Sequence, residues 1–270
     1  MVTSISSQLA ALQAINELSR RLEITQLRVT SGLKVTGPQD NPSSFSIAQS
    51  LHGDISGVTA VKTALGTGES TVEAAIAAGE SIEDLLTEIK ATVVSATASG
   101  LSNDERDALH SSFASLRDQI TSVVASAEFN NINLVQSAST TLTVLSTEAG
   151  STITINSQAL DTTSLGLNVL NLTKQNDATS ALTVVSTTIT TAASRVANLG
   201  SSLSRLESQS EFIDKTIDVL EGEVGNFVDA DLTEESAQLT ALQIQQQIAV
   251  QALAIANASP QNLLALFSFL

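Results

Sequence analysis

Apolar residues recur in alternating steps of three and four along residues 182–227. Such a stripe, with a period of 3.5 residues, lies along one side of an α-helix and packs against another helix. At 1.5 Å per residue this stripe extends about 70 Å, which is longer than a globular core requires. The pattern predicts a long helix over residues 180–227, with only Ser210 breaking the apolar series Leu182, Val185, Ile189, Ala192, Val196, Leu199, Leu203, Leu206, Ser210, Ile213, Ile217, Leu220, Val224 and Phe227.

The first half of the chain shows three further helical patterns. Residues 5–33 carry apolar positions on one side and end near Gly32, before a turn-rich stretch that contains two prolines. A longer helix is expected from Ser43 or Ser44 to Gly100, with Gly68 and Gly79 on its apolar face, where small residues let a partner helix approach closely. Ser102 and Glu105 have the spacing of a capping box, which predicts a third helix ending near residues 129–131. The apolar face of the long helix is Leu51, Ile55, Val58, Val61, Leu65, Val72, Ala75, Ile82, Leu86, Ile89, Val93 and Ala96.

The pattern changes to alternation between residues 140 and 157. Leu142, Val144, Ile153 and Ile155 alternate with polar residues around a central glycine, which predicts a β-hairpin. A short break at residues 229–233 precedes a final helix over residues 234–258, which is expected to end before Pro260. The predicted fold is mainly α: a long antiparallel helical bundle or coiled-coil rod with one β-hairpin, in which the N- and C-terminal helices are paired.

Composition supports long helices and bounds the chemistry. The chain has three prolines, no cysteine, 3% aromatic residues and a formal net charge of -16 at pH 7. The few prolines leave long helices uninterrupted. Absence of cysteine excludes disulfides and thiolate zinc sites, and the acidity disfavours binding of nucleic acid. We expect no nucleic-acid partner and, because no stretch reaches about 18 apolar residues, no membrane partner.

Catalytic equipment is not evident in the sequence. The two histidines, His52 and His110, are expected to be ordinary surface residues. The acidic clusters around Glu80, Asp104 and Glu234 lack the alternating oxygen pattern of a calcium loop, and no nucleophile elbow or phosphate loop occurs. We therefore predict no enzymatic activity, no catalytic or metal-binding residues and no cofactor.

The two ends of the chain are unusual because both are apolar-periodic. Chain ends are usually polar and frayed, and an exposed apolar end requires a cover from another subunit or a chaperone. From Gln243 to Leu270 no residue is charged. Intersubunit contact is therefore the preferred interpretation of the terminal helices, and the residues expected to mediate polymerisation are Leu9, Leu12, Ile15, Leu18, Leu22, Leu239, Leu242, Ile248 and Leu253.

Several short segments, in order, resemble those of bacterial flagellins. Residues 28–34 (RVTSGLK), followed by Asp40-Asn41 and Ile47-Ala48, are similar to the signature near the flagellin N-terminus. Phe129-Asn130-Asn131 is similar to an F-N-G element, and residues 164–167 (SLGL) to the segment that closes the N-terminal half. Residues 228–231 with Glu234 resemble the D-A-D-x-x-x-E break, and residues 254–266 resemble the A-x-A-N-x-x-P-Q-x-x-L-x-L ending.

This resemblance implies a subunit that self-polymerises into the extracellular flagellar filament used for motility. It implies that residues 1–42 and 232–270 form an inner coiled-coil domain, and that residues 43–231 form a helical rod domain with a hairpin near 140–157. It also implies export through the flagellar type III apparatus, in agreement with the missing cleavable signal. The expected partners are the chain itself, hook-associated junction and cap proteins, and an export chaperone that contacts Leu263, Leu264, Leu266 and Phe267.

One departure from many flagellins is that no variable outer domain follows residues 164–167, because the return helix starts within about fifteen residues. Three alternatives remain. A hook–filament junction protein shares the terminal helices. A coiled-coil signalling or secretion-needle protein would form an oligomer of fixed size and leaves the hairpin unexplained. An enzyme would carry a bound metal or cofactor after purification.

Overall fold

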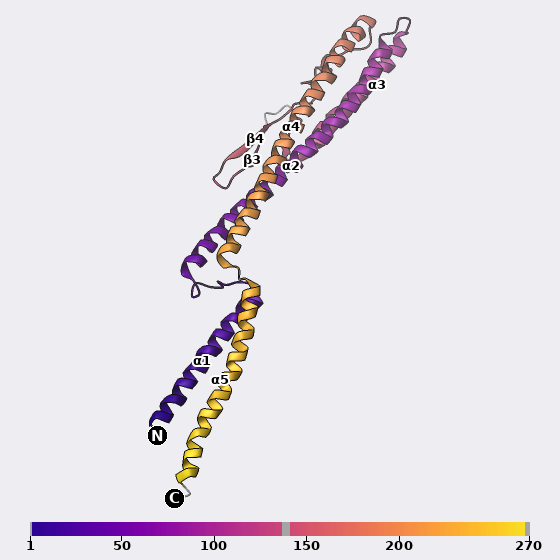
Figure 1. Ribbon diagram of the computed structural model, residues 1–270. Helices are drawn as coiled ribbons and strands as arrows, with labels where there is room; N and C mark the ends of the chain where they lie inside the picture. Colours follow the sequence, from indigo (N-terminus) through magenta and orange to yellow (C-terminus); the bar gives the residue numbers. More distant parts are fainter. Residues whose placement is uncertain (1, 137–140, 268–270) are drawn as a thin grey trace. The chain divides into compact units, whose positions relative to one another are not determined.

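A computed structural model describes the backbone of residues 2–136 and 141–267, and the side chains of residues 9–136 and 141–255. The chain divides into two compact units: one is Met1–Gly53 with Val219–Leu270, and the other is Asp54–Asp218. We call these the terminal unit and the central unit. The helices are α1 (Val2–Ser31), α2 (Pro42–Ala96), α3 (Asn103–Ser126), α4 (Gln175–Val228) and α5 (Leu232–Phe267), with a short 3-10 helix η1 (Leu167–Val169) (Figure 1).

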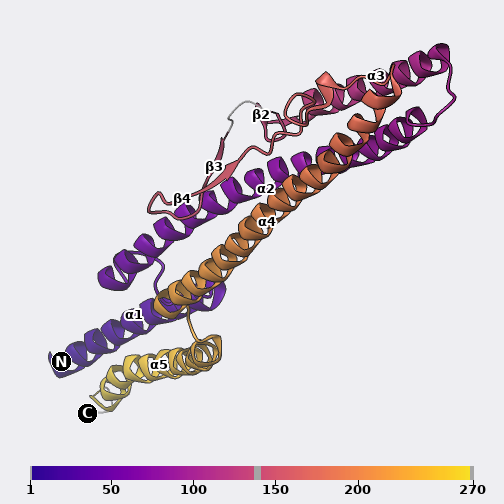
Figure 2. The same ribbon diagram turned by 90° about the horizontal axis from the view of Figure 1, so that it is seen from above.

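Two antiparallel hairpins complete the fold. Strands β3 (Thr141–Leu145) and β4 (Thr152–Asn156) pair with Thr141 opposite Asn156 and Leu145 opposite Thr152. Their alternating burial puts Leu142, Val144 and Ile155 in the core, so the predicted hairpin is confirmed. The mainly α fold with paired terminal helices is likewise confirmed, because α1 and α5 lie side by side in both views (Figures 1 and 2).

The core of the central unit lies between the apolar faces that the sequence predicts. From Val58 to Ala96, every residue of the predicted α2 stripe is buried. On α4 the burial has a period of seven: Val185, Ala192, Leu199, Leu206 and Ile213 are buried. The intervening heptad positions, among them Ile189, Leu203 and Ile217, are only half-buried. One of the two apolar rows of α4 is therefore covered within the chain.

The two glycines expected on the apolar face of α2 have different neighbours. A Cβ on Gly79 would lie 2.6 Å from Cγ2 of Val196 on α4, so this glycine allows close helix packing as predicted. A Cβ on Gly68 would lie 2.6 Å from Cγ2 of Val144 on β3. Gly68 therefore accommodates the hairpin and not a helix, which corrects the expectation for this position.

The ends of two helices, α3 and α5, differ from the sequence-based expectation. Helix α3 ends at Ser126, and a small hairpin of β1 (Glu128–Phe129) and β2 (Ile132–Asn133) follows. Its two-residue turn holds Asn130 and Asn131 at positive φ, which asparagine tolerates better than most residues. Helix α5 continues through Pro260 to Phe267, although an interior proline removes one helical hydrogen bond.

Candidate functional site

The terminal unit contains most of the residues that the sequence singles out for assembly. Helix α1 ends at Ser31, and the next residue, Gly32, has a φ of 75° that favours glycine and donates its N–H to the carbonyl of Arg28 at 2.8 Å. The chain then forms a single β-bridge, Leu33 with Asp229. Lys34 N donates to Val228 O at 2.7 Å and Ala230 N donates to Gly32 O at 2.8 Å. Backbone hydrogen bonds therefore join the two halves of the unit where α1 and α5 meet.

Side-chain caps fix the helix starts on both sides of this bridge. Asn41 Oδ1 accepts the N–H groups of Ser43 and Ser44 at the start of α2, and Pro42 occupies the first helical position. Asp231 Oδ1 accepts the N–H groups of Thr233 and Glu234 at the start of α5. The bond from Glu234, followed by that from Thr233, lowers the pKa of Asp231 below its ordinary value.

One partly buried ion pair links α1 to α5. Arg28 donates from one guanidinium nitrogen to Glu235 Oε1 at 3.0 Å, and the Glu235 side chain is only 10% exposed. Burial removes Glu235 and part of Arg28 from water, so the ion pair stabilises the contact only if its hydrogen-bond geometry compensates for the lost hydration. The sequence directs attention to Glu234 through the family motif, but Glu234 is exposed and Glu235 makes the ion pair. The amphipathic spacing of α5, with Glu235 seven residues before Leu242, is the signal that identifies it.

The nine residues predicted to mediate polymerisation fall into two groups. Leu242 is buried between the helices, and Ile15, Leu18, Leu22, Leu239 and Leu253 are half-buried. Leu9, Leu12 and Ile248 are exposed by 60%, 48% and 59%. Residues of the first group lie at the α1–α5 contact of one chain, whereas those of the second are not covered by their own chain.

Further exposed apolar side chains lie on the same two helices and were not among the predicted residues. They are Ile24 and Leu27 on α1, and Leu232, Ile244, Val250 and Ile255 on α5. A single sequence shows which helix face is apolar but not which part a partner helix covers, so these residues could not be separated from the core beforehand. Leu9, Leu12, Ile24 and Leu27 share one side of α1, and Ile244, Ile248 and Ile255 share one side of α5; together these seven residues form what we call the uncovered apolar face.

The predicted chaperone-contact residues lie at the end of α5. The backbone of Leu263, Leu264, Leu266 and Phe267 is helical, but their side chains lie outside the described residues. Nothing in the structure therefore tests that prediction.

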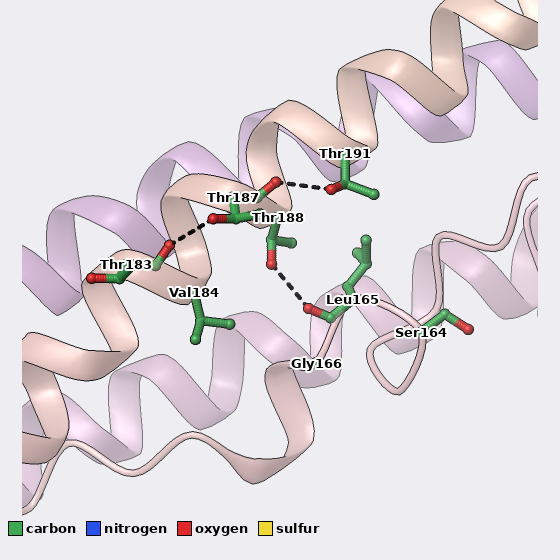
Figure 3. A pocket seen from close by; sticks show the side chains of 8 residues that line it. All are labelled: Ser164, Leu165, Gly166, Thr183, Val184, Thr187, Thr188 and Thr191. Atoms are coloured by element: carbon green, nitrogen blue, oxygen red, sulfur yellow. Dashed lines mark hydrogen bonds between the residues drawn. The ribbon is translucent and has the colours of Figure 1, made fainter.

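The central unit has a shallow pocket between the residue 164–166 turn and α4 (Figure 3). It has a volume of about 360 Å³ and is lined by threonine and apolar side chains. Thr188 Oγ1 donates to Leu165 O at 2.9 Å, and Thr187 and Thr191 donate to the carbonyl four residues earlier. The hydroxyls of Thr187, Thr188 and Thr191 are thus engaged, and none of the eight lining residues is titratable.

The two histidines differ. His52 is exposed on α2, in agreement with the prediction for it. His110 is half-buried, with its ring stacked on Phe113 at a centroid distance of 6.2 Å, so the expectation of a surface residue is wrong. His110 lies three residues before Phe113 on α3, so the two rings are on the same side of the helix.

Among the described helices, none is both long and apolar enough to cross a bilayer.

Comparison with known proteins gives consistent matches over the whole chain. Residues 2–140 match the bacterial flagellin N-terminal helical region and residues 182–267 match the bacterial flagellin C-terminal helical region. Flagellin FljO of Caulobacter vibrioides is 36% identical over 98% of both chains. A flagellin of Brucella melitensis is 35% identical over 97% of both chains.

Two solved structures share the fold. The crystal structure of Bacillus cereus flagellin matches with a TM-score of 0.50 and 24% identity, over 54% of this chain and 86% of that one. A putative flagellar hook-associated protein from Vibrio parahaemolyticus matches with a TM-score of 0.60 and 12% identity, over 70% of this chain and 100% of that one. At these identities the likeness concerns the fold alone.

Proposed function

Because the chain belongs to the bacterial flagellin family and is a structural subunit of the flagellar filament, we propose that it polymerises through the uncovered apolar face of α1 and α5. The single observation that carries this proposal is the exposure of Leu9, Leu12 and Ile248 on paired helices. Fully burying such a side chain stabilises by about 1.5–3 kcal/mol. Several of them, repeated at every subunit, supply a driving force for association.

The junction-protein alternative is not favoured. The sequence identity of about 36% is to flagellins, whereas the hook-associated protein shares only the fold. The flagellin family is a structural protein family, and we propose no catalytic role for this chain. A signalling coiled coil or secretion-needle protein is not supported by full-length matches to flagellins.

The finer features of the role are also proposals. Residues 1–42 and 232–270 form the inner domain of the filament, and residues 43–231 form the surrounding domain. The subunit acts in motility after export through the flagellar type III apparatus. Before export a chaperone covers Leu263, Leu264, Leu266 and Phe267, and in the filament the end subunits contact hook-associated junction and cap proteins. Support for these statements comes from family membership and from the apolar, uncharged chain end.

Lysine substitutions on α1 test the proposal. Leu12→Lys places a charge on the uncovered apolar face, and we expect it to abolish elongation from short filament seeds, as seen by electron microscopy. Gln13→Lys is the matched control: it adds the same charge one residue away, at an exposed polar position. The control variant should elongate like the wild type.

An equivalent pair exists on α5. Ile248→Lys alters the uncovered apolar face, and Gln247→Lys adds the same charge at the preceding exposed position. Elongation of both apolar-face variants at the wild-type rate would refute the proposal. Closed oligomers of fixed size from the wild type would instead support a coiled coil of another kind.

A further inference from the structure

The terminal unit contains an acidic pocket at the meeting point of α1 and α5. It has a volume of about 550 Å³, and five carboxylates line it: Asp40, Asp229, Asp231, Glu234 and Glu235. Two bases, Arg28 and Lys34, also line it. The lining therefore carries an excess of three negative charges when all of these groups are ionised, and such a site favours a cation.

Two of the carboxylates are held ionised by hydrogen bonds from this chain. Asp40 Oδ2 accepts from Thr36 Oγ1 at 2.8 Å, from Thr36 N at 2.9 Å and from Gly37 N at 3.2 Å. The Thr36 hydroxyl makes the largest contribution to lowering the pKa of Asp40. Asp231 caps α5, and its pKa is lowered in the same way. These groups keep the pocket negative near neutral pH.

One carboxylate of the pocket, Glu235, has an oxygen whose hydrogen-bonding capacity is not used by this chain's described residues. The residue is 8% exposed and its Oε1 accepts from Arg28, but its Oε2 is buried and accepts no hydrogen bond from any residue whose side chain the structure describes. Neither base of the pocket supplies this bond, because Arg28 is bound to Oε1 and Lys34 Nζ donates to Asn226 O at 2.9 Å. A buried carboxylate oxygen without a donor costs free energy, which a bound cationic donor recovers.

We propose that this pocket binds the guanidinium group of Arg21 from a second copy of the chain. The inference rests on the proposed function, because it requires that copies associate through α1 and α5. No set of three metal-ligating side chains converges among the described residues, so an organic cation fits the pocket better than a metal ion. An arginine fits a carboxylate that has one free oxygen, because its guanidinium carries several donors.

Elimination among the bases of the terminal unit identifies Arg21. The unit has four arginine or lysine residues within 1–53 and none within 219–270. Arg28 and Lys34 already line the pocket, and Arg20 pairs with Glu17. Arg21 is exposed, and it lies three residues before the exposed Ile24. A copy that docks through the uncovered apolar face therefore presents Arg21 beside it.

The contact must join two copies. Arg21 precedes Arg28 by seven residues, or about 10 Å along the helix axis, and it does not line the pocket of its own chain. Donor and pocket thus lie at different places on each copy. A contact between unlike surfaces leaves a free donor at one end and a free pocket at the other, which permits open-ended growth.

The first test compares seeded elongation of Arg21→Glu with that of Lys174→Glu. Both variants change the charge by the same amount at an exposed position, and Lys174 lies in the central unit. We expect Arg21→Glu to elongate about tenfold more slowly or worse, and Lys174→Glu to elongate normally. Adding Glu234→Arg to Arg21→Glu restores an opposite-charge pair and should recover elongation. Arg21→Lys keeps the charge and should lose less than Arg21→Glu.

Mixing experiments distinguish the direction of the contact. Glu235→Gln weakens the pocket and keeps the donor, whereas Arg21→Glu removes the donor and keeps the pocket. Added in small amounts to wild-type protein on wild-type seeds, one of the two variants should bind the growing end and stop it, and the other should not bind. Equal behaviour of both variants would contradict the proposed contact.

Failure of this inference is distinguishable from failure of the proposed function. If wild-type protein elongates seeds and Arg21→Glu elongates at the same rate, the Arg21 contact is wrong and the filament role stands. If wild-type protein does not elongate seeds at all, both are wrong. Far-UV circular dichroism of each variant checks that reduced elongation is not due to loss of helix.

Discussion

At the scale of single residues, buried charges mark where helices are joined. Arg106 on α3 is 6% exposed and donates to the carbonyls of Ala96 and Ala98, at the end of α2. The last carbonyls of a helix lack partners within it, and a side chain from the next helix satisfies them here. The capping box of Ser102 and Glu105 is predictable because it is local, and it is present. The role of Arg106 is not predictable from local spacing, because its acceptors belong to another helix.

Replacing Arg106 with leucine should destabilise the protein. The substitution removes the donor of two carbonyl groups at the end of α2. A hydrogen bond to a charged group contributes about 1.5–3 kcal/mol to stability. We expect a loss of about 2 kcal/mol in the free energy of unfolding, measured by guanidinium chloride unfolding and circular dichroism. Arg117→Leu on the same helix is the control, because Arg117 forms its ion pair with the exposed Asp118, and its effect should be within about 0.5 kcal/mol. Equal effects of both substitutions would contradict the capping role.

Glu105 gives α3 a dependence on pH. Its carboxylate accepts from the N–H and the hydroxyl of Ser102, and these bonds lower the pKa of Glu105 below the ordinary value of 4.5. A group with a lowered folded-state pKa stabilises fully above its unfolded pKa, and this contribution is lost as the pH falls through the lowered value. The Tm difference between wild type and Glu105→Gln should therefore be constant above about pH 5.5 and shrink below the ordinary pKa of the glutamate. A difference independent of pH down to acid denaturation would contradict this account.

At the scale of secondary-structure elements, periodicity determines most of the fold. The α2 and α4 stripes predict which residues are buried, because a long helix must cover its apolar face. Two features are not predictable in this way. Asn130 and Asn131 form a tight turn between two-residue strands, too short to show alternation. The α5 helix continues past Pro260, although proline usually ends or kinks a helix.

Two glycines of α2 allow a matched test of helix packing. Gly79→Ala places a methyl group 2.6 Å from Cγ2 of Val196, so the Val196 side chain or one of the two helices must shift. Overpacking of this kind costs about 1–3 kcal/mol, which exceeds the gain of up to about 1 kcal/mol in helix propensity. Gly66→Ala meets no atom within 4 Å and should only gain from the higher propensity. Thermal unfolding should show a lower Tm for Gly79→Ala and an equal or higher Tm for Gly66→Ala; the opposite order would show that α2 and α4 are not closely packed there.

At the scale of the whole molecule, charge and apolar surface have opposite effects on association. A net charge of -16 makes copies repel one another, so the contacts between copies must be apolar or involve specific ion pairs. Both kinds are available in the terminal unit, on the uncovered apolar face and in the acidic pocket. The pairing of the terminal helices follows from their apolar stripes. The stripes do not show which of their residues remain uncovered, because this depends on which side of each helix packs against the other.

The most direct test of this account is amide hydrogen exchange, measured by mass spectrometry, of the wild-type protein as free subunit and as seeded filament. We predict that peptides from residues 9–31 and 232–255, whose apolar face is uncovered in the subunit, exchange faster there than in the filament, where they become strongly protected. Peptides from the α2–α4 core should be protected in both states. Equal exchange of the terminal helices in subunit and filament would show that polymerisation does not cover them, and would contradict the central claim.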